Sequence, residues 1–514
     1  IYWVIISNIL KTKKKMLSLL LAVCLVLTLM PTTALATETS TAATWDGSIA
    51  TAFEGGNGTA DDPYQIATGA ELAYLANNVN AGENYEGTYF VLTQDIDLNR
   101  IPWTPIAKSF SNALFGSLDY YVFAGEFDGN GHTISNLTIG TESVPLEADV
   151  FGLFGATDGK ISDLNLKNVS INGVAKTVSG YAIGLAGGLV GAANGPVENC
   201  HVTNLSLNMT TPDSGRAAAY WIGGLVGVLD GSQYIKKCSV SGKIEEASGK
   251  GSIGGLIGEL GEKAKISYSR ANVVLNVASN YYGGAAVGGF IGNGNSNEET
   301  MIQNCYATGN VTQAAAAMAS FVGSDASAGY AYGSIKNCYT TGSVVGTAPN
   351  KYAFAMQDAT KRSEITNCYF ADVNADIKNT NETSIAKSLE KMKEKGFVTL
   401  LNDSDDSNGW FFIEGQMPLC GAEPADYSKV DEAIAKADAL NKDEYKNFSA
   451  VEAAVNAVDR TKSKAEQAEV DAMATAIENA IAALEKKPAS SGGSYVPVQK
   501  PEVVSMPNIL DYLT

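Results

Sequence analysis

Residues 187–200 read Gly187-Gly188-Leu189-Val190-Gly191-Ala192-Ala193-Asn194-Gly195-Pro196-Val197-Glu198-Asn199-Cys200, and this stretch contains both motifs on which the fold depends. The first motif, called the glycine clasp below, consists of glycines on either side of two apolar residues. Other copies are Gly152-Leu153-Phe154-Gly155, Gly223–Gly227, Gly254–Gly258, Gly288–Gly292 and a degenerate copy, Ala319-Ser320-Phe321-Val322-Gly323. The final glycines of successive copies lie 36, 36, 31, 34 and 31 residues apart, so the clasp marks an internal repeat.

The second motif is Ile-x-Asn-Cys or a variant of it, and after the first clasp the two motifs alternate. Its copies begin at Ile134, Ile161, Val197, Ile235, Ile266, Ile302, Ile335 and Ile365. Short β-branched runs separated by glycine turns at this period are typical of a solenoid whose coils stack on one another. We therefore predict a mainly β chain whose body is a right-handed parallel β-helix, or β-solenoid.

The Asn of the second motif has a predicted structural role. Ile and Cys, three residues apart, can both point inward only if the chain turns between them. Asn and Asp tolerate left-handed backbone better than most residues, and they therefore suit this turn. Stacked amides could then hydrogen-bond along a column. This predicts an asparagine ladder at Asn136, Asn199, Asn304, Asn337 and Asn367.

Five of the seven cysteines occupy the last position of the second motif, where other copies carry Leu137, Leu164 or Ser269. A position that accepts Leu and Ser favours a buried column of free thiols, although disulfides remain the alternative in an exported protein. The chain has two histidines and no Cys-x-x-Cys pair, so we expect no metal centre and no cofactor.

The N-terminal residues indicate export. Lys11 and Lys13–Lys15 form a basic region, Leu17–Met30 is apolar, and Ala34-Leu35-Ala36 fits a signal-peptidase site. Residues 1–36 are therefore predicted to be a signal peptide with some upstream residues, and Thr37 the first mature residue. We expect the protein to be secreted or held at the cell surface. Its net charge of −19 disfavours nucleic acid as a partner, and no transmembrane span is expected in the mature chain.

The solenoid needs covers at both ends, because open sheet edges pair with other chains. Residues 37–126 are predicted to form a linker and the N-terminal cap, with a helix over 69–79 and a strand over 89–98. The solenoid itself is expected over 127–380. Residues 381–424 are predicted to form the C-terminal cap, with a helix over 389–401 and a closing strand over 410–413.

Charge density changes near Ala425. Residues 425–487 contain 22 charged residues in 63, against 32 in 241 over residues 130–370. Apolar stripes at helical spacing predict three short helices packed as a bundle, with a capping box at Ser449–Glu452 opening the second. Residues 488–514 are predicted to be a flexible tail, because they begin with a Ser/Gly-rich run.

The clasps, together with Asp95-Ile96-Asp97-Leu98 and Phe127–Ile134, resemble GLUG repeats of exported bacterial proteins and the segments that precede them. The similarity covers about residues 50–420 and implies a surface protein. Some relatives carry a His-Glu-x-x-His peptidase motif, which this chain lacks. Residues 425–487 resemble a FIVAR module through Tyr427, Asn441 with Tyr445, and Gln467 with Val470 and Asp471. That resemblance implies a spacer or binding module.

No catalytic constellation is recognised in the sequence. His132 is expected to have a role in a turn or the core, and His201 to face solvent. Asp95 and Asp97 are expected to share one face of a strand, where they would form polar surface rather than a catalytic carboxylate pair. Asp403, Asp405 and Glu414 are the weak candidates for a calcium loop, which lacks glycine at its sixth position.

Two functions therefore remain open. The first is a non-catalytic adhesin that binds an extracellular glycan or a host or cell-surface protein, with Tyr281, Tyr282, Tyr330 and Tyr332 as candidate contacts. The second is a carbohydrate-active enzyme, of the polysaccharide lyase or glycoside hydrolase type, that uses acids in a groove of the solenoid. A cleft lined by acids with displaced pKa values would favour the enzyme.

Overall fold

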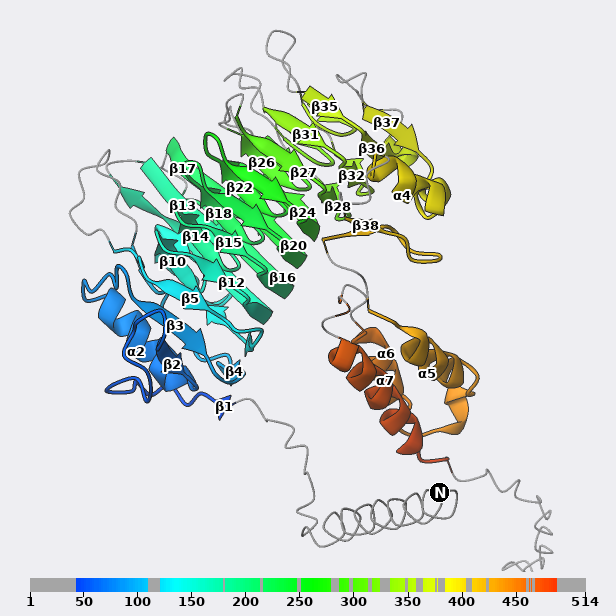
Figure 1. The fold of residues 1–514 in the computed structure, drawn as a ribbon, viewed down its shortest axis with the longest axis horizontal. Helices are drawn as coiled ribbons and strands as arrows, with labels where there is room; N and C mark the ends of the chain where they lie inside the picture. The colour runs from blue at the N-terminus through cyan, green and yellow to red at the C-terminus, as the bar shows by residue number, and fades with distance from the viewer. Residues whose placement is uncertain are drawn as a thin grey trace, which may run out of the picture. The chain divides into compact units, whose positions relative to one another are not determined.

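The computed structural model describes residues 43–109, 121–178, 181–212, 216–246, 251–278, 286–294, 299–312, 317–323, 333–346, 350–356, 364–374, 377, 384–403, 409–421, 425–458, 462, 464 and 467–487. It divides into two compact units, residues 1–421 and 422–514. The predicted β-solenoid is confirmed in the first unit, where strands of successive coils stack in parallel and follow the chain order (Figure 1). No helix of the described residues is long and apolar enough to cross a membrane.

Each coil contributes strands to as many as four sheets. Within each sheet, the strands of successive coils pair in parallel. The corner sheet consists of β2 (Tyr64–Ile66), β3 (Tyr89–Leu92), β5 (Glu126–Asp128), β11 (Ile161–Ser162), β15 (Val197–Glu198), β19 (Tyr234–Lys236), β23 (Lys265–Ser267), β27 (Met301–Gln303), β31 (Ser334–Lys336) and β35 (Glu364–Thr366). The clasp sheet consists of β10 (Phe154–Thr157), β14 (Val190–Ala193), β18 (Val226–Leu229), β22 (Ile257–Leu260) and β26 (Ile291–Gly294).

The other two layers are joined through β12 and β13. The broad sheet consists of β1 (Ala43–Thr44), β4 (Ile96–Asp97), β6 (Thr133–Ser135), β7 (Thr138–Ile139), β8 (Leu146–Ala148), β12 (Asn165–Val178), β16 (His201–Thr210), β20 (Ser239–Glu246), β24 (Arg270–Val277), β28 (Tyr306–Ala307), β29 (Val311–Thr312), β32 (Tyr339–Thr340), β33 (Val344–Val345), β36 (Cys368–Ala371) and β37 (Ser384–Lys387). The return sheet consists of β9 (Val150–Phe151), β13 (Tyr181–Gly187), β17 (Arg216–Gly223), β21 (Ser252–Gly254), β25 (Ala286–Gly288), β30 (Ala317–Ala319) and β34 (Asn350–Tyr352).

The glycine clasp is the tight connection between the return sheet and the clasp sheet. A Cβ atom on Gly254 would collide with the carbonyl oxygen of Ile257, and it would lie 2.6 Å from the backbone nitrogen of Gly292 in the next coil. The last glycine of the motif is constrained as well, because a Cβ atom on Gly258 would lie 2.5 Å from the nitrogen of Ile222. The motif therefore consists of glycines because backbone packs directly on backbone at this connection.

The predicted turn lies where each coil passes from the corner sheet to the broad sheet. The residue before the thiol position has left-handed backbone in seven stacked coils, with φ between +51° and +56°. The corner residues are Asp163, Asn199, Lys237, Tyr268, Asn304, Asn337 and Asn367. The predicted inward turn is therefore confirmed, and the same backbone is imposed on Lys237 and Tyr268.

The predicted asparagine ladder is confirmed only in part. Nδ2 of Asn199 donates to Oδ1 of Asp163 at 2.7 Å, and Nδ2 of Asn367 donates to Oδ1 of Asn337 at 2.9 Å. The placement of Asn136 in this column is wrong, because β6 pairs with the start of β12 and not with β11.

Asn136 belongs to a second ladder farther along the broad sheet. Its Nδ2 donates to Oδ1 of Asp97 at 2.7 Å, and its Oδ1 accepts from Asn168, which in turn accepts from Asn204. All three asparagines of this ladder have left-handed backbone. Amide columns therefore occur at two different left-handed turns of the described coils.

Lys237 is an exposed residue in this left-handed corner, with φ of +56° and no Asn side chain to offset the strain. We expect Lys237→Asn to raise the free energy of unfolding by about 1 kcal/mol, because Asn adopts left-handed backbone at lower cost. Urea unfolding of both proteins measures the change. Lys265→Asn is the matched control, since it removes the same charge from an exposed strand position. An equal change in the free energy of unfolding in both variants would show that the lost positive charge, and not the backbone conformation, is responsible for the change.

The predicted column of buried free thiols is confirmed. Cys200, Cys238, Cys305, Cys338 and Cys368 are free and buried, and Cys420 elsewhere is too. Each column thiol donates to the carbonyl two residues earlier, at 3.1–3.3 Å, and Ser269 does the same at 2.9 Å. Each of these carbonyls also accepts from a backbone N–H of the preceding coil, as Glu198 does from Asp163 at 3.0 Å, so the column adds a second hydrogen bond to each of them.

Burial raises the pKa of Cys200, Cys338 and Cys368 well above the ordinary thiol range, and it raises the pKa of Cys420 to about 12. Unfolded thiols titrate near pH 8.5. Above that pH the unfolded state releases protons that the folded state keeps, so stability falls as pH rises, by about 1.4 kcal/mol per pH unit for each such thiol. Below about pH 8.5, the stability that these raised thiol pKa values contribute is fully present.

We expect the folded chain from Thr37 to resist a thiol reagent at pH 8 and to react at all six cysteines once unfolded. Urea midpoints measured between pH 7 and 10 should fall steeply above pH 8.5. The double variant Cys338→Ser and Cys368→Ser should flatten this fall, because Ser269 shows that a hydroxyl satisfies the position. Rapid labelling of the folded chain, or an unchanged slope in the variant, would contradict the prediction.

The N-terminal segment includes the predicted helix, α2 (Gly69–Val79), whose Leu72, Leu75, Ala76 and Val79 are buried. Thr68 and Glu71 form a capping box that the sequence analysis missed. The predicted single strand over residues 89–98 is wrong. It is divided between β3 in the corner sheet and β4 in the broad sheet, because the chain turns a corner at residues 93–95.

The C-terminal segment of the first unit differs from a simple end cap. β37 extends the broad sheet, but α3 (Leu389–Met392), α4 (Lys395–Leu401), β38 (Trp410–Phe411) and β39 (Leu419–Cys420) pack on the outside of that sheet. They cover an outward column of Tyr306, Tyr339 and Tyr369. The Tyr339 hydroxyl donates to the carbonyl of Pro418 at 2.8 Å, and Trp410 lies 5.4 Å from the Tyr339 ring. This back-folded segment therefore contacts several coils.

The second unit contains the three predicted helices, α5 (Ser428–Asp438), α6 (Ser449–Asn456) and α7 (Gln467–Ala482), with the short turn η4 (Lys442–Glu444) between the first two. Val430, Val451, Val470 and Ile477 lie in its core. The predicted capping box at Ser449 is wrong, because Ser449 lies inside α6 and its hydroxyl makes no cap. Asn447 instead joins the end of α7, accepting from the Glu485 amide and donating to the Ala483 carbonyl.

Candidate functional surfaces

The outward face of the broad sheet carries ordered columns of polar side chains. Parallel register aligns its side chains in columns, one of which contains Asn172, Asn208, Glu245, Asn276 and Thr312. Nδ2 of Asn208 donates to Oδ1 of Asn172 at 2.8 Å, and the Thr312 hydroxyl donates to Oδ1 of Asn276. Successive members lie about 4.8 Å apart, as strands in a sheet do.

Exposure on this face increases toward β24 and β33. Asn272 and Asn276 are exposed, and so are the valines Val274 and Val345. The nearby Lys243 and Glu245 form an ion pair at 3.3 Å, which leaves little net charge there. Amide side chains and small apolar side chains therefore make up the exposed part of this face on β24.

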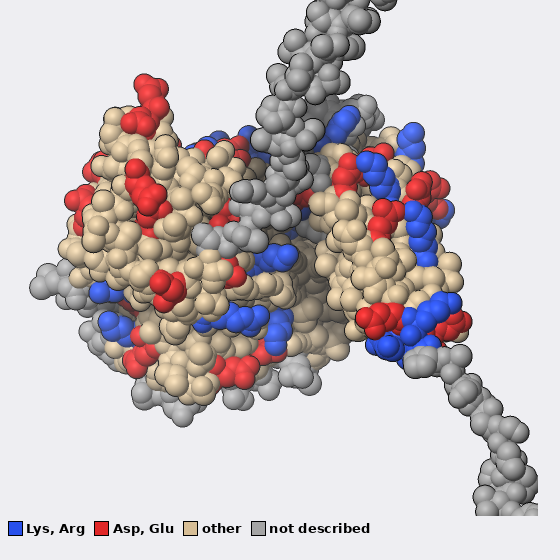
Figure 2. Space-filling model, turned by 90° about the horizontal axis from the view of Figure 1, so that it is seen from below, with Lys and Arg blue, Asp and Glu red and all other residues tan. Residues whose placement is uncertain are grey.

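Several charged side chains elsewhere on the described surface form ion pairs. On the corner sheet, burial raises the pKa of Glu198, but Lys236 and Lys160, at 3.1 and 3.2 Å, outweigh it and hold that pKa below its usual range. In the view of Figure 2, acidic and basic side chains are interspersed among broad uncharged areas. A strongly basic patch of the kind that binds nucleic acid is not seen on that face.

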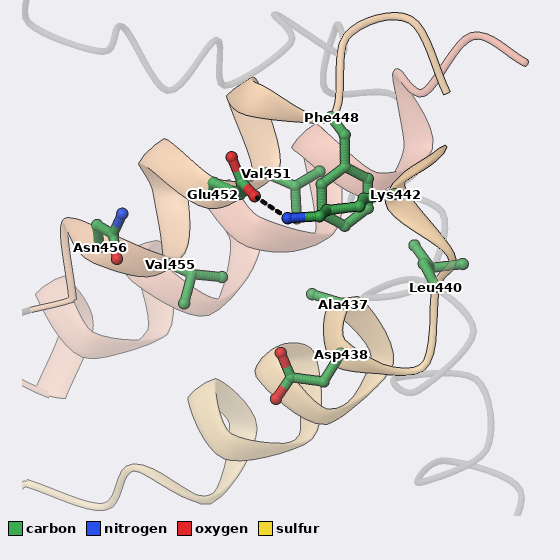
Figure 3. A pocket seen from close by; sticks show the side chains of 9 residues that line it. All are labelled: Ala437, Asp438, Leu440, Lys442, Phe448, Val451, Glu452, Val455 and Asn456. Carbon is green, nitrogen blue, oxygen red and sulfur yellow. Dashed lines mark ion pairs between the residues drawn. The ribbon is translucent and has the colours of Figure 1, made fainter. Parts of the chain in front are cut away.

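The helical unit contains a groove between α5 and α6, with a volume of about 420 Å³. Figure 3 shows the apolar side chains Leu440, Val451, Val455 and Phe448 around it, with Ala437. The Lys442 and Glu452 side chains, 3.8 Å apart, form an ion pair at its rim. Sequence reasoning did not locate this groove, because the same residues satisfy the pattern of an ordinary helical core.

The two histidines have neighbours that fit structural roles. Nδ1 of His132 lies 3.2 Å from Oδ1 of Asp95, which also accepts from the Thr133 amide. His201, expected to face solvent, is instead half-buried, and its Nδ1 lies 2.8 Å from the Ser239 hydroxyl. The thiol of its neighbour Cys200 points into the core, so these two residues form no nucleophile–base pair.

The expectation that Asp95 and Asp97 share the face of one strand is wrong. Asp95 lies in the corner before β4, and only Asp97 lies in the strand. Oδ1 of Asp97 accepts from the Asn99 amide and from Asn136. Both carboxylates therefore hold turns in place.

Several predicted contacts fall outside the described residues. Tyr281, Tyr282, Tyr330 and Tyr332 all do, and so does Asp405 of the candidate calcium loop. Asp403 follows α4 with left-handed backbone, and Glu414 is exposed beyond β38. Within the described ranges, no group of three or more His, Cys, Asp or Glu side chains could hold a metal ion. The calcium loop therefore stays a prediction.

The GLUG motif family matches residues 283–312, one coil that contains β25, β26, β27, β28 and β29. Halomucin of Haloquadratum walsbyi is 36% identical over 133 residues, which are 25% of this chain and 1% of that protein. A protein named as a Gly-rich membrane protein of Evansella cellulosilytica is 32% identical over 135 residues, which are 25% of this chain and 13% of the relative. The chain therefore spans a small fraction of the curated relatives it matches.

Two solved structures share part of the fold at low sequence identity. One is described as an immunoglobulin A1 protease of Bacteroides ovatus, with a TM-score of 0.40, 22% identity, and coverage of 72% of this chain and 95% of that chain. The other is described as an IgA1 protease, with a TM-score of 0.42, 18% identity, and coverage of 77% and 29%.

Proposed function

We propose that this chain is an exported, non-catalytic surface protein that binds an extracellular glycan, or a host or cell-surface protein, through the outward face of its broad sheet. The observation that carries the proposal is the in-register array of amide and hydroxyl side chains from β12 to β29. The GLUG match and the resemblance to halomucin and a Gly-rich membrane protein support a location at the cell surface. The FIVAR resemblance of residues 425–487 supports a spacer that projects the solenoid.

The chemistry of the described residues supports binding over catalysis. Asp95, Asp97, His132 and His201 all have structural neighbours. Asp46, Glu198, Asp426 and Asp471 have pKa values below the usual range, which favours the ionised form and not the protonated form that a general acid needs.

A glycan array probed with the chain from Thr37, run beside an assay for released reducing ends and unsaturated products, tests the proposal. We expect binding to at least one neutral glycan and no product. New reducing ends or unsaturated sugars would replace the proposal with the carbohydrate-active enzyme. Absence of binding to glycans and to host-cell proteins would remove it altogether.

Substitutions on β24 locate the binding surface. Asn272→Glu with Asn276→Glu should weaken glycan binding by about tenfold or more, because each lost hydrogen bond costs about 1 kcal/mol and a tenfold change is 1.4 kcal/mol. Gln303→Glu with Thr366→Glu adds the same charge on the corner sheet and should leave binding unchanged. Equal losses in both variants would show that net charge, and not the broad sheet, governs binding.

A further inference from the structure

The broad sheet ends in an open edge at the C-terminal end of the solenoid. β37 is the last strand of this sheet, and within the described residues its only strand partner is β36. Ile385, in the middle of β37, is 51% exposed, and Ala386 beside it is also exposed. A strand with a neighbour on one side only directs every second backbone N–H and C=O away from the sheet, where these groups can pair with another strand.

This edge lacks the features that usually keep sheet edges from pairing, which are prolines and outward-directed charges. β37 consists of Ser384-Ile385-Ala386-Lys387 and contains no proline. The ammonium group of Lys387 lies 5.2 Å from the centroid of the Tyr369 ring on β36, so its charge is directed toward the neighbouring strand and not beyond the edge. Val373, which is 56% exposed, lies in η2 (Asp372–Asn374), which contacts β37. The edge is therefore bordered by exposed apolar side chains.

The N-terminal end of the solenoid is closed. α2 packs there, and its Leu72 and Leu75 are buried in the same core as Phe90 of β3. β1, the first strand of the broad sheet, has only two residues. Figure 1 shows α2 at one end of the stack of strands and β37 at the other. A second copy stacked head to tail would have to displace α2, so the open C-terminal edge fits the same edge of another copy.

We propose that β37 pairs in antiparallel orientation with β37 of a second copy, which joins two chains by the C-terminal ends of their solenoids. A two-fold axis perpendicular to the sheet relates the two strands, and opposed residues then point to the same face. The register that sets Ile385 opposite Ile385 of the second copy buries both exposed side chains against each other. It also sets Ser384 opposite Ala386. The two Lys387 side chains stay apart, because they follow the central pair in opposite directions.

The paired strands would join the broad sheets of two chains into one sheet whose outward faces lie on the same side. Two copies of the face proposed above to bind a ligand would then act together, which raises the apparent affinity for a repetitive ligand. Pairing over four residues buries less surface than the roughly 1,200 Å² of a stable interface, so we expect a dissociation constant on the order of 10–100 μM. The pairing itself does not depend on whether that face binds a glycan.

Sedimentation equilibrium of the chain from Thr37, from about 1 to 300 μM, tests the proposal, because this range brackets the expected affinity. We expect conversion of monomer to dimer as the concentration rises. Ile385→Lys should weaken the dimer by about tenfold or more, because it sets two positive charges directly opposite each other. Ile49→Lys is the matched control, since it makes the same change at a residue of the N-terminal segment that is 55% exposed, and it should leave the dimer unchanged.

A cysteine at the centre of the interface gives an independent measurement. The six native cysteines of the described residues are buried, so the thiol added by Ile385→Cys is the reactive one. Oxidation by dissolved oxygen with a copper catalyst should join two such chains through one disulfide, as both thiol protons and two electrons pass to the oxidant. Ile49→Cys chains should remain single. A monomer throughout the concentration range would overturn the proposal, as would a dimer that persists in Ile385→Lys, or equal linkage of the two cysteine variants.

Discussion

Gly254→Ala is expected to lower the stability of the solenoid by more than about 3 kcal/mol, or to prevent folding of the coils on either side of it. The added Cβ atom would collide with the Ile257 carbonyl oxygen and approach the Gly292 nitrogen of the next coil to 2.6 Å. Both obstacles are backbone atoms, so no side-chain rotation relieves the collision, and the stacked strands must shift. Urea unfolding of the chain from Thr37, followed by circular dichroism, measures the loss.

Gly396→Ala is the control for this prediction. Gly396 lies in α4, and nothing lies within 4 Å of the position of its added Cβ atom. The change should stabilise the helix slightly, because Ala is favoured over Gly in helices by about 1 kcal/mol. A Gly254→Ala protein as stable as Gly396→Ala would show that the clasp tolerates side chains.

The clasp constraint is not uniform along the solenoid. In the return sheet, Gly288 aligns with Ala319 and then with Tyr352, so the last coils accommodate a side chain where the middle coils exclude one. Ala319 and Tyr352 form a small separate cluster with Met356. The large effect is therefore expected for the middle coils, and Ala319→Gly should bring no comparable gain.

Phe321→Ala is expected to destabilise the solenoid by about 3–5 kcal/mol. Phe321 is fully buried between the rings of Phe290 and Phe354, with ring centroids 4.8 and 4.9 Å away. Its removal leaves a cavity between two coils and breaks both stacked pairs, each worth about 0.5–1.5 kcal/mol beyond its buried area. The urea midpoint measures the change.

Phe321→Leu separates the two causes, because Leu fills most of the cavity but cannot stack. It should recover more than half of the loss. Phe412→Ala provides the surface control, since Phe412 is 38% exposed. If Phe321→Ala unfolds at the same urea concentration as Phe412→Ala, the phenylalanine column makes no contribution to coil stacking.

Local backbone chemistry explains which parts of the fold could be predicted from the sequence. The clasp glycines and the Ile-x-Asn-Cys corner each satisfy a constraint within a few residues, so their spacing revealed the solenoid and the thiol column. Asn136 shows where this reasoning fails. Its motif resembles the others, but register with Asn168 and Asn204 places it at a different corner. Motif similarity does not specify which strand lies above which.

The candidate sites depend on long-range packing and were therefore harder to predict. The sequence of α5 and α6 shows apolar stripes but not the groove between these helices, which arises because both pack on α7. In the same way, the sequence does not show that Trp410 and Phe397, from a segment far along the chain, cover the rings of Tyr306 and Tyr339. The outward columns of the broad sheet follow from register alone.

The back-folded segment determines how the solenoid would bear mechanical load. The described part of the first unit ends at Gly421, where an added Cβ atom would lie 3.1 Å from that of Tyr268, three coils before Tyr369. Tension applied through residues beyond 421 would therefore enter the side of the stack near Tyr268. Such tension would load the contacts that Trp410 and Pro418 make with several coils at the same time. It would not separate β37 from its neighbouring strand by breaking one hydrogen bond after another.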